Sequence, residues 1–442
     1  MLTNDNQRGR IVILFGAGAT LSWNSPKTYE LTTLVRKSGF KTTDNQTTIT
    51  EYLFQALLKS GYSENDINFE TIINLIEELT VYYSWFDSEK KLPSLIGCLL
   101  TPRFEKEIFN FSIKGGEIKH GYQLQIPAGK DYEFSDFAYH NETPQQFFLL
   151  HLLSEILTDI SARISKYAYH TSGHSVVDVS SPISNQFCKW IASLSKRSVL
   201  RIYTLNYDRI FKILLERNGV SLFEGFDCGE NIPVGESLRA NVPKILKDND
   251  CNCHYNLHGS AYWEVLNLDK NHLPNPEIVL TSGPNLPINN NPASFQVEKG
   301  KTLLVTNIIT GYQKVQKTNI TPYRQMYSAF DDDCCFADEI FIIGYSFGDE
   351  HINQSLKTAI RYNPKLKITI VDPSFIKNKM DFQFAIKFFP YRQAGNLNPK
   401  KVAENLYSYF DGAFVVHTKT FEEFLDTASN GHIANRVDGR EP

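Results

Sequence analysis

Three short stretches, far apart in the chain, combine residue types that bind nucleotides and move protons. They are FGAGAT at 15–20, TLNYD at 204–208 and LHGS at 257–260. Glycines let a backbone approach a pyrophosphate, an asparagine amide orients water or a ribose hydroxyl, and an imidazole accepts a proton near neutral pH. Each stretch alone is a weak signal, but their order indicates one dinucleotide pocket equipped for acid–base chemistry.

The glycine-rich turn follows an apolar run at 11–15 that is typical of a strand buried on both faces of a sheet. We expect Gly16, Ala17, Gly18 and Thr20 to contact a pyrophosphate at this strand end. Residue 21 is leucine, so the full GxGxxG fingerprint of a dehydrogenase is not met. The alternative is a tight turn that binds nothing.

Asn206 and Asp208 follow a second strand predicted at 198–205. Because open α/β sheets hold their ligands at the carboxyl ends of strands, we expect both side chains to act there. Asp208 directly precedes an amphipathic run at 209–217, so an N-cap of that helix and a functional carboxylate are equally open interpretations.

His258 ends a predicted strand at 254–257 and is followed by glycine. Its imidazole is suited to act as a general base. The alternative is a histidine whose polar atoms are satisfied inside a loop. His254, His351 and His417 also lie near the ends of predicted elements, so position alone does not select His258.

Two further strand ends carry polar residues. The run IIGYSFGDE at 342–350 offers Gly344 and Ser346 to a ribose or phosphate, whereas Asp349 is expected to cap the next helix. Asp372 ends the following strand, where an acid commonly binds ribose hydroxyls. The alternative for Asp372 is turn formation, because Asp-Pro initiates turns.

These motifs require strands that alternate with helices, so we predict an α/β fold: a Rossmann-like doubly wound parallel sheet with a large, mostly helical insertion. Residues 1–40 and 196–430 form the predicted Rossmann domain, 41–195 the helical insertion and 431–442 a disordered tail. The expected strands of the sheet are 11–15, 198–205, 254–257, 303–306, 339–343, 366–371 and 413–417. The expected helices are 28–37, 68–83, 144–166, 182–194, 209–217, 350–362 and 420–427.

Composition excludes several classes of function. A formal charge of -4 over 442 residues gives no footprint of a phosphate-backbone binder, so no direct nucleic-acid contact is expected. There is no apolar run of about 20 residues for a membrane span and no signal peptide, so we expect a cytoplasmic protein. The seven cysteines fit neither a disulfide framework nor the C-x₂₋₄-C spacing of zinc, so no metal is expected.

The four motifs, as Gly16-Ala17-Gly18, Asn206-Tyr207-Asp208, His258-Gly259 and Gly344-Tyr345-Ser346, resemble the sirtuin family in both content and order. The string GYSFGDEHIN at 344–353 is similar to the bacterial branch of that family found in antiphage defence. The resemblance covers 8–38 and 198–375. Protein deacylases of the family carry a P-D-F-R string and a zinc ribbon with two C-x-x-C pairs, both missing here, which disfavours peptide deacylation.

The resemblance implies a hydrolase that uses NAD⁺ as substrate, cleaves its nicotinamide–ribose bond and depletes NAD during abortive infection. His258 would be the general base, Asn206 would position the nucleophile and the ribose, and Asp208 would give electrostatic support. Two alternatives remain: a non-catalytic NAD or ADP-ribose binding module, and a sirtuin-type deacylase or ADP-ribosyltransferase. Since unregulated hydrolysis would kill the host, the resemblance also implies control through a homo-oligomer, a HerA-type ATPase or another defence-system sensor.

Overall fold

The computed structural model describes most of the 442-residue chain. The residues described are 8–83, 96–97, 99–114, 122–127, 143–168, 170–171, 174–175, 177–227, 237–267, 276–281, 294–298, 301–311, 314–375 and 400–429. The predicted disordered tail at 431–442 lies outside them. The chain forms two compact units: Met1–Ser25, Tyr167–Ser260 and Ile320–Pro442 make the first, and Pro26–Lys166 and Ala261–Asn319 the second. The predicted domain boundaries stay a prediction.

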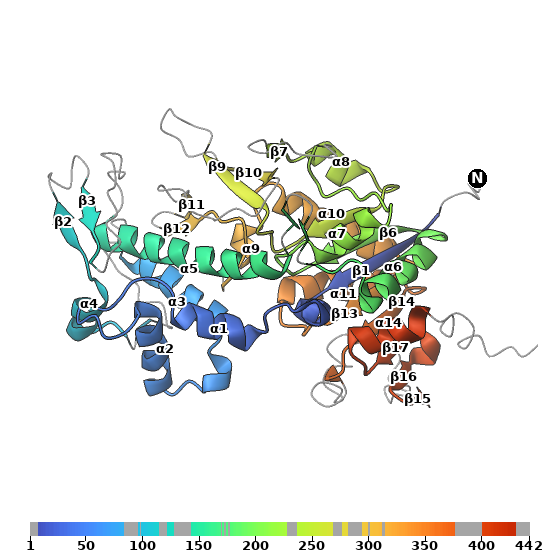
Figure 1. Ribbon diagram of the computed structural model, residues 1–442, viewed down its shortest axis with the longest axis horizontal. Helices are drawn as coiled ribbons and strands as arrows, with labels where there is room; N and C mark the ends of the chain where they lie inside the picture. Colours follow the sequence, from blue (N-terminus) through green and yellow to red (C-terminus); the bar gives the residue numbers. More distant parts are fainter. Residues whose placement is uncertain are drawn as a thin grey trace, which may run out of the picture. The chain divides into compact units, whose positions relative to one another are not determined.

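An eight-stranded sheet is the centre of the first unit (Figure 1). Its order is β15-β16-β17-β14-β13-β1-β6-β8, and the six strands from β17 to β8 are parallel. The strands are β1 (Gly9–Phe15), β6 (Ser198–Thr204), β8 (Cys253–Asn256), β13 (Glu339–Ile343), β14 (Lys367–Val371), β15 (Lys400–Ala403), β16 (Leu406–Tyr409) and β17 (Phe414–His417). The predicted Rossmann-like α/β fold is confirmed.

The prediction that residues 303–306 form a strand of this sheet is wrong. The run expected at 303–306 forms β12 (Lys301–Leu304), which pairs antiparallel with β11 (Ser294–Glu298) in a separate two-stranded sheet of the second unit. A short apolar run predicts a strand but not its partner, because pairing is decided by the neighbours that the chain brings to it. The antiparallel edge strands β15 and β16 were not predicted.

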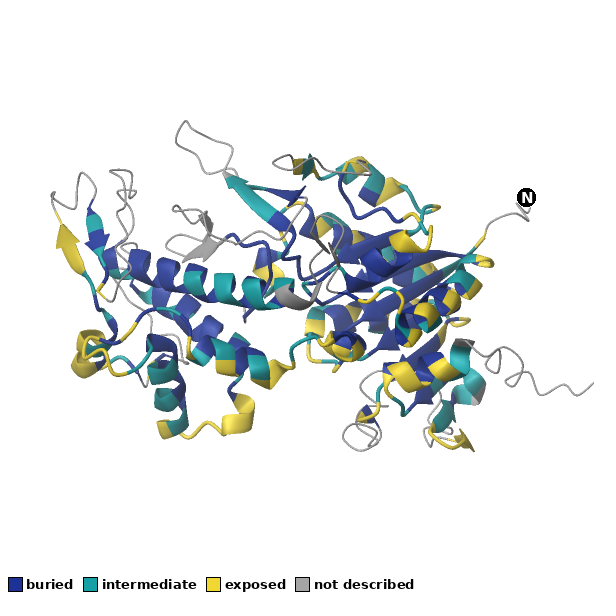
Figure 2. Cartoon of the chain, viewed as in Figure 1, coloured by how far each residue is buried: buried dark blue, intermediate teal, exposed yellow. Residues whose placement is uncertain are grey.

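Helices pack on both faces of the sheet. On one face, the Phe15 ring of β1 stacks on Phe211 with a centroid distance of 3.9 Å and also contacts Phe187 and Phe421. On the other face, Tyr203 of β6 contacts Phe330 at 4.8 Å. The central strands are buried (Figure 2) because both faces are covered, which explains their continuous apolar runs. The helices involved are α6 (Pro182–Ser195), α7 (Ile210–Arg217) and α14 (Phe421–Ser429) on the first face, and α10 (Tyr323–Phe336) and α11 (Glu350–Tyr362) on the second.

Local sequence signals explain where several helices begin. Ser181 accepts a hydrogen bond from the Ser184 N–H at 3.3 Å, and Pro182 opens α6. Thr143 accepts from the Gln146 N–H at 3.0 Å, and α5 (Pro144–Ala168) also opens with proline. In both helices a Ser/Thr-Pro pair marks the start, because a capped N-terminus satisfies N–H groups that have no partner inside the helix.

The second unit is built mainly of helices. They are α1 (Thr28–Arg36), α2 (Ile49–Lys59), α3 (Phe69–Tyr82), α4 (Pro102–Ile108), most of α5, and α9 (Lys314–Lys317). It also contains the antiparallel pairs β2 (Ser112–Lys114) with β3 (Gln123–Gln125), and β9 (Trp263–Asn267) with β10 (Pro276–Thr281). The structure also describes shorter elements in the two units: η2 (Glu64–Asp66), β4 (His170–Thr171), β5 (His174–Ser175), β7 (Ser237–Arg239), α8 (Val242–Lys247) and η5 (Phe410–Gly412).

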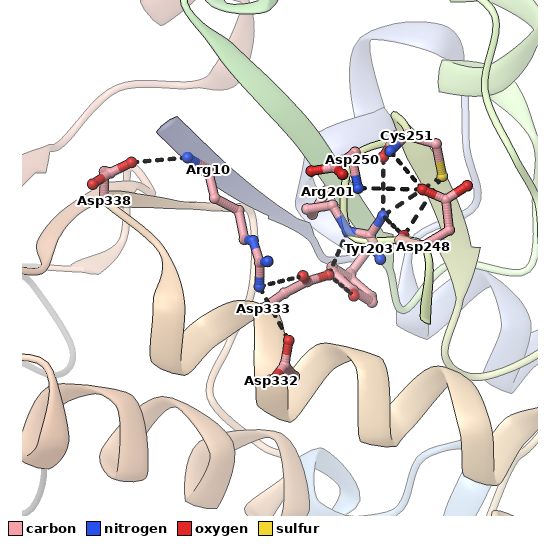
Figure 3. Close-up of polar contacts among 9 residues, drawn as sticks. All are labelled: Arg10, Arg201, Tyr203, Asp248, Asp250, Cys251, Asp332, Asp333 and Asp338. Carbon is pink, nitrogen blue, oxygen red and sulfur yellow. Dashed lines mark hydrogen bonds and ion pairs between the residues drawn. The ribbon is translucent and has the colours of Figure 1, made fainter. Parts of the chain in front are cut away.

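A buried charge network lies where β1, β6 and α10 meet (Figure 3). Arg201 donates from Nε to Asp333 at 2.6 Å, and the two side chains are 0% and 1% exposed. Tyr203 also donates to Asp333, and Arg10 contacts it at 3.0 Å. An arginine inside a strand was not an expected core residue. It is accommodated because its charge is met by the Asp333 carboxylate and its Nη1 donates to the backbone carbonyls of Asp248 and Cys251.

Within the described residues, no helix is both long enough and apolar enough to cross a membrane. The five cysteines that the structure describes are free thiols.

Candidate functional site

The glycine-rich turn after β1 packs directly on the turn after β13. The Gly16 N–H donates to the Ile343 carbonyl at 2.9 Å, and the Gly18 N–H donates to the Gly344 carbonyl at 2.9 Å. Gly344 has φ +61°, and a Cβ there would lie 2.3 Å from the Ala19 nitrogen. These glycines therefore allow two backbone turns to touch, a role that the sequence pattern alone does not distinguish from pyrophosphate binding.

The turn continues into a short 3₁₀ helix, η1 (Ala17–Trp23), instead of an α-helix. A phosphate site at an α-helix N-terminus, which often follows such a turn, is therefore not formed here. Ala17 is exposed and Gly18 is half-buried, so this part of the turn is accessible from solvent, whereas Thr20 is buried.

Asn206 connects the end of β6 to this turn. Its side-chain Nδ2 donates to the Gly16 carbonyl at 3.2 Å and approaches the Thr20 hydroxyl at 3.3 Å. The side chain is buried, since Asn206 is 9% exposed. An amide in this position holds two neighbouring strand ends in a fixed relation.

Asn256, to which the sequence analysis gave no role, links the turns after β6 and β8. Its Nδ2 donates at 3.0 Å to both the Asn206 and the Asp208 carbonyl oxygens. The Ser260 hydroxyl adds a bond to the Tyr207 carbonyl at 3.2 Å. The sequence placed Asn256 inside the strand predicted at 254–257, whereas in the structure it is the last residue of β8. The structure thus joins the segments that carry Asn206 and His258.

Asp208 is 2% exposed, and its Oδ1 accepts a hydrogen bond from the Ile210 N–H at 3.0 Å. This bond satisfies the N–H of the first residue of α7, but the N-cap of that helix is Arg209, so the interpretation of Asp208 as the N-cap is wrong by one residue. Its catalytic role stays a prediction.

His258 lies in a group of three possible ligands for a cation. It is 3% exposed, and its ring centroid is 5.8 Å from that of His351. One ligand atom from each of His258, Asp349 and His351 lies within 4.8 Å of the other two. In the sequence, His351 is only one of several histidines near the end of a predicted element, and tertiary structure alone brings the two rings together.

His351 is oriented by the phenol of Tyr327, a half-buried residue. The Tyr327 hydroxyl of α10 lies 3.0 Å from His351 Nε2. Burial raises the pKa of Tyr327 well above its ordinary value, so the phenol stays neutral. Tyr327 lies 24 residues before His351 on another helix, and no motif signals this partnership.

Asp349 occupies the N-cap position of α11, as expected, but its side chain makes no capping hydrogen bond. The carboxylate instead belongs to the group with the two histidines. Ser346 is exposed, whereas Tyr345 next to it is buried and donates to the Asn353 side chain at 3.1 Å.

Asp372 ends β14 and forms the turn that its Asp-Pro pair predicts. Its Oδ1 accepts bonds from the N–H and the hydroxyl of Ser374 at 2.8 Å and 2.7 Å. The side chain is only half-buried. Turn formation therefore accounts for one carboxylate oxygen, and the ribose role stays a prediction.

Arg209 and Lys212 of the segment after Asp208 form ion pairs with Glu224. Burial alone would raise the pKa of Glu224, but Arg209 and Lys212 outweigh it and hold that pKa at about 2. Arg209 contacts Glu224 at 2.7 Å, directly after the Asn206–Asp208 turn. The ion pairs anchor the start of α7 and so help to fix that turn.

A cavity of about 430 Å³ lies at the opposite edge of the sheet, next to the network of Figure 3. It includes the start of β1 and the residue before β13. There Arg10 is bound by Asp332 at 3.1 Å and by Asp338 through its backbone N–H at 2.8 Å. Parallel α/β sheets bind ligands at their carboxyl edge, so this cavity at the amino edge is not the candidate site. Its lining residues are Arg8, Gly9, Arg10, Val199, Asn249, Asp250, Asp332, Phe336 and Asp338.

The comparison with protein families gives one match. A family model described as a SIR2-like domain matches residues 200–383. The match includes the Asn206, His258, Gly344 and Asp372 strand ends, while the Gly16–Gly18 turn lies before it and is joined to it by the bonds described above. No curated protein matches the chain. A SIR2-like domain indicates an NAD-related function. The match supports a sirtuin-like family for this part of the chain.

Proposed function

We propose that the protein hydrolyses NAD⁺ at the nicotinamide–ribose bond and releases nicotinamide and ADP-ribose. One observation carries the proposal: the turns bearing Asn206 and His258 are joined through Asn256, and Asn206 in turn bonds the Gly16 turn. Three polar motifs from distant parts of the chain therefore meet at the carboxyl edge of one parallel sheet, where such folds bind nucleotides.

The chemistry needs few groups. The C1′–N bond breaks and its electron pair returns to the pyridinium ring, so nicotinamide leaves neutral. Water adds to C1′ and gives up a proton to the imidazole of His258. The Asn206 amide holds the nucleophile and the ribose, while the Asp208 carboxylate stabilises the positive charge that develops on the ribose.

Binding of the dinucleotide falls to residues at the same edge. Ala17 and Ser346 are exposed, and Gly18, Gly344 and Asp372 are half-buried, so a ligand reaches them from solvent. In the proposal these residues, with Gly16 and Thr20, contact the pyrophosphate and ribose groups. The contact between this turn and the pyrophosphate must differ from that in a dehydrogenase. A 3₁₀ helix follows the turn, and the Gly16 and Gly18 N–H groups are bonded to protein carbonyls.

We further propose that hydrolysis serves prokaryotic antiphage defence by depletion of NAD⁺ in the cytoplasm. Such an activity must be silent until infection. Control then comes from a homo-oligomer or from a partner such as a HerA-type ATPase or another sensor protein.

The test is a chromatographic time course of NAD⁺, nicotinamide and ADP-ribose with the purified full chain. His258→Ala and Asn206→Ala are expected to lower turnover by about 100-fold or more. The matched control is Asn363→Ala, which removes a 2.7 Å amide bond to the Ala337 carbonyl beyond the far end of α11. Unchanged turnover in both site variants would remove the catalytic assignment.

The same time course in bacterial cells that express the chain, with and without phage, supplies any missing activator. NAD⁺ binding without turnover in every condition would favour a regulatory binding module instead. Turnover of an acetylated peptide would favour a deacylase.

A further inference from the structure

We propose that His258, Asp349 and His351 form a binding site for a divalent transition-metal ion, with Zn²⁺ as the ion best suited to it. The juxtaposition of two imidazoles and one carboxylate carries the inference. It does not depend on NAD⁺ hydrolysis, because metal binding is measured without turnover.

The ligand types suit such an ion. Imidazole nitrogen and carboxylate oxygen are the donors of zinc sites that keep an open position, and two histidines with one carboxylate is a frequent set. The three ligand atoms lie within 4.8 Å of one another. In a tetrahedral site with bonds of about 2.0 to 2.1 Å, ligand atoms lie about 3.3 Å apart. Small changes in side-chain conformation would bring the three ligand atoms to this separation.

The surroundings hold the His258 side chain in place but allow the side chains of Asp349 and His351 to move. His258 is 3% exposed and held in a turn bonded to the rest of the sheet edge, so it is the fixed ligand. Asp349 and His351 are only half-buried at the start of α11, so their side chains have room to close on an ion.

Two details point to ligation instead of helix capping. Asp349 stands at the N-cap of α11 without a capping hydrogen bond from its side chain. His351 is met at Nε2 by the Tyr327 hydroxyl at 3.0 Å. Histidines that bind metals usually have the second ring nitrogen bonded to an oxygen in this way, which fixes the ring and its tautomer. Nδ1 is then the nitrogen that binds the ion.

The test uses the purified full chain, stripped with EDTA and then dialysed. Zn²⁺ binding is measured by calorimetry, and Co²⁺ binding by its visible absorption, which reports nitrogen and oxygen ligands directly. We expect one ion per chain. Asp349→Asn and His351→Gln are expected to weaken binding by about 100-fold, and Tyr327→Phe by about 10-fold.

The matched control is Glu350→Gln. Glu350 is next to Asp349, but it bonds Gln354 and Lys357 at 2.7 Å and lies outside the group of three. The affinity of the Glu350→Gln variant for Zn²⁺ is expected to equal that of the unmodified chain. Circular dichroism checks the fold of each variant, and Tyr327→Phe keeps the test valid if a ligand variant does not fold.

Absence of binding to the unmodified chain would overturn the proposal. So would equal affinity in Asp349→Asn, His351→Gln and Glu350→Gln. A chain that binds the ion but never hydrolyses NAD⁺ would overturn the proposed function alone.

Discussion

Asn206 Nδ2 lies 3.2 Å from the Gly16 carbonyl oxygen, and this one bond joins the end of β6 to the turn after β1. Replacing the amide by a carboxylate of the same shape removes the donor and sets two oxygens against each other. We expect Asn206→Asp to lower NAD⁺ turnover by about 100-fold. Asn363→Asp, which makes the same change at an amide that donates to the Ala337 carbonyl at 2.7 Å outside the site, is expected to change turnover much less. Equal losses in the two variants, measured as kcat, would contradict this role.

The contact of Gly344 with the first turn predicts a large effect of one added carbon. Gly344→Ala puts Cβ 2.3 Å from the Ala19 nitrogen, so we expect a loss of about 3 kcal/mol or more in the free energy of unfolding. Gly219 is the matched control, since it has φ +77° with nothing within 4 Å of a Cβ. Gly219→Ala is expected to cost only about 1 kcal/mol for its backbone conformation. Similar values in urea unfolding would show that the backbone approach is not tight.

The buried pair Arg201–Asp333 predicts a non-additive result. Asp333→Leu leaves a guanidinium that is 0% exposed without its carboxylate, and we expect a loss of about 3 to 5 kcal/mol. The double variant Arg201→Met with Asp333→Leu is expected to be more stable than Asp333→Leu alone, because the unpaired Arg201 charge is gone and Arg10 keeps its ion pair with Asp332 at 3.1 Å. Urea unfolding of the three chains checks this. Additive losses would contradict it.

Two buried histidines predict a loss of stability in mild acid. Burial lowers the pKa of His254 to about 4, and burial with a smaller effect of Lys419 lowers the pKa of His417 to about 4. An unfolded histidine titrates near 6.5, so the unfolded chain binds more protons as pH falls from 6.5 to 4. The stability they contribute is complete above 6.5 and lost across that range. We expect a loss of about 2 kcal/mol per histidine by pH 5.

Urea unfolding at pH 7 and pH 5 measures this loss. His417→Gln is expected to show a smaller difference between the two pH values. Glu224 does not interfere, because its pKa of about 2 confines its effect to lower pH. Equal stability at both pH values would contradict the prediction.

The proposed base and the proposed metal ligand are the same imidazole, so the two proposals together predict inhibition. Zn²⁺ at one equivalent is expected to stop NAD⁺ hydrolysis, because a metal-bound His258 accepts no proton from water. EDTA is expected to restore the rate, and Asp349→Asn to resist inhibition. Tight Zn²⁺ binding with an unchanged rate would contradict the role of His258 as base.

Much of the fold was predictable because the relevant signals are local. The apolar run before Gly16 is buried on both faces in β1, and the helix expected at 182–194 is α6. Strand 301–304 shows the limit, since its apolar pattern did not say that its partner would be β11. Pairing depends on contacts distant in sequence, which no local pattern encodes.

The sequence by itself determined the polar residues at the strand ends and their order along the chain, because a strand followed by a glycine or asparagine turn is a local pattern. Only the tertiary structure decided their neighbours. In the structure Asn206 donates to the Gly16 carbonyl, and Asn256 donates to two backbone carbonyls in the turn after β6. His351 is hydrogen-bonded to Tyr327 and lies near His258. These pairs lie up to 190 residues apart, and they meet because parallel strands place their carboxyl ends at one edge.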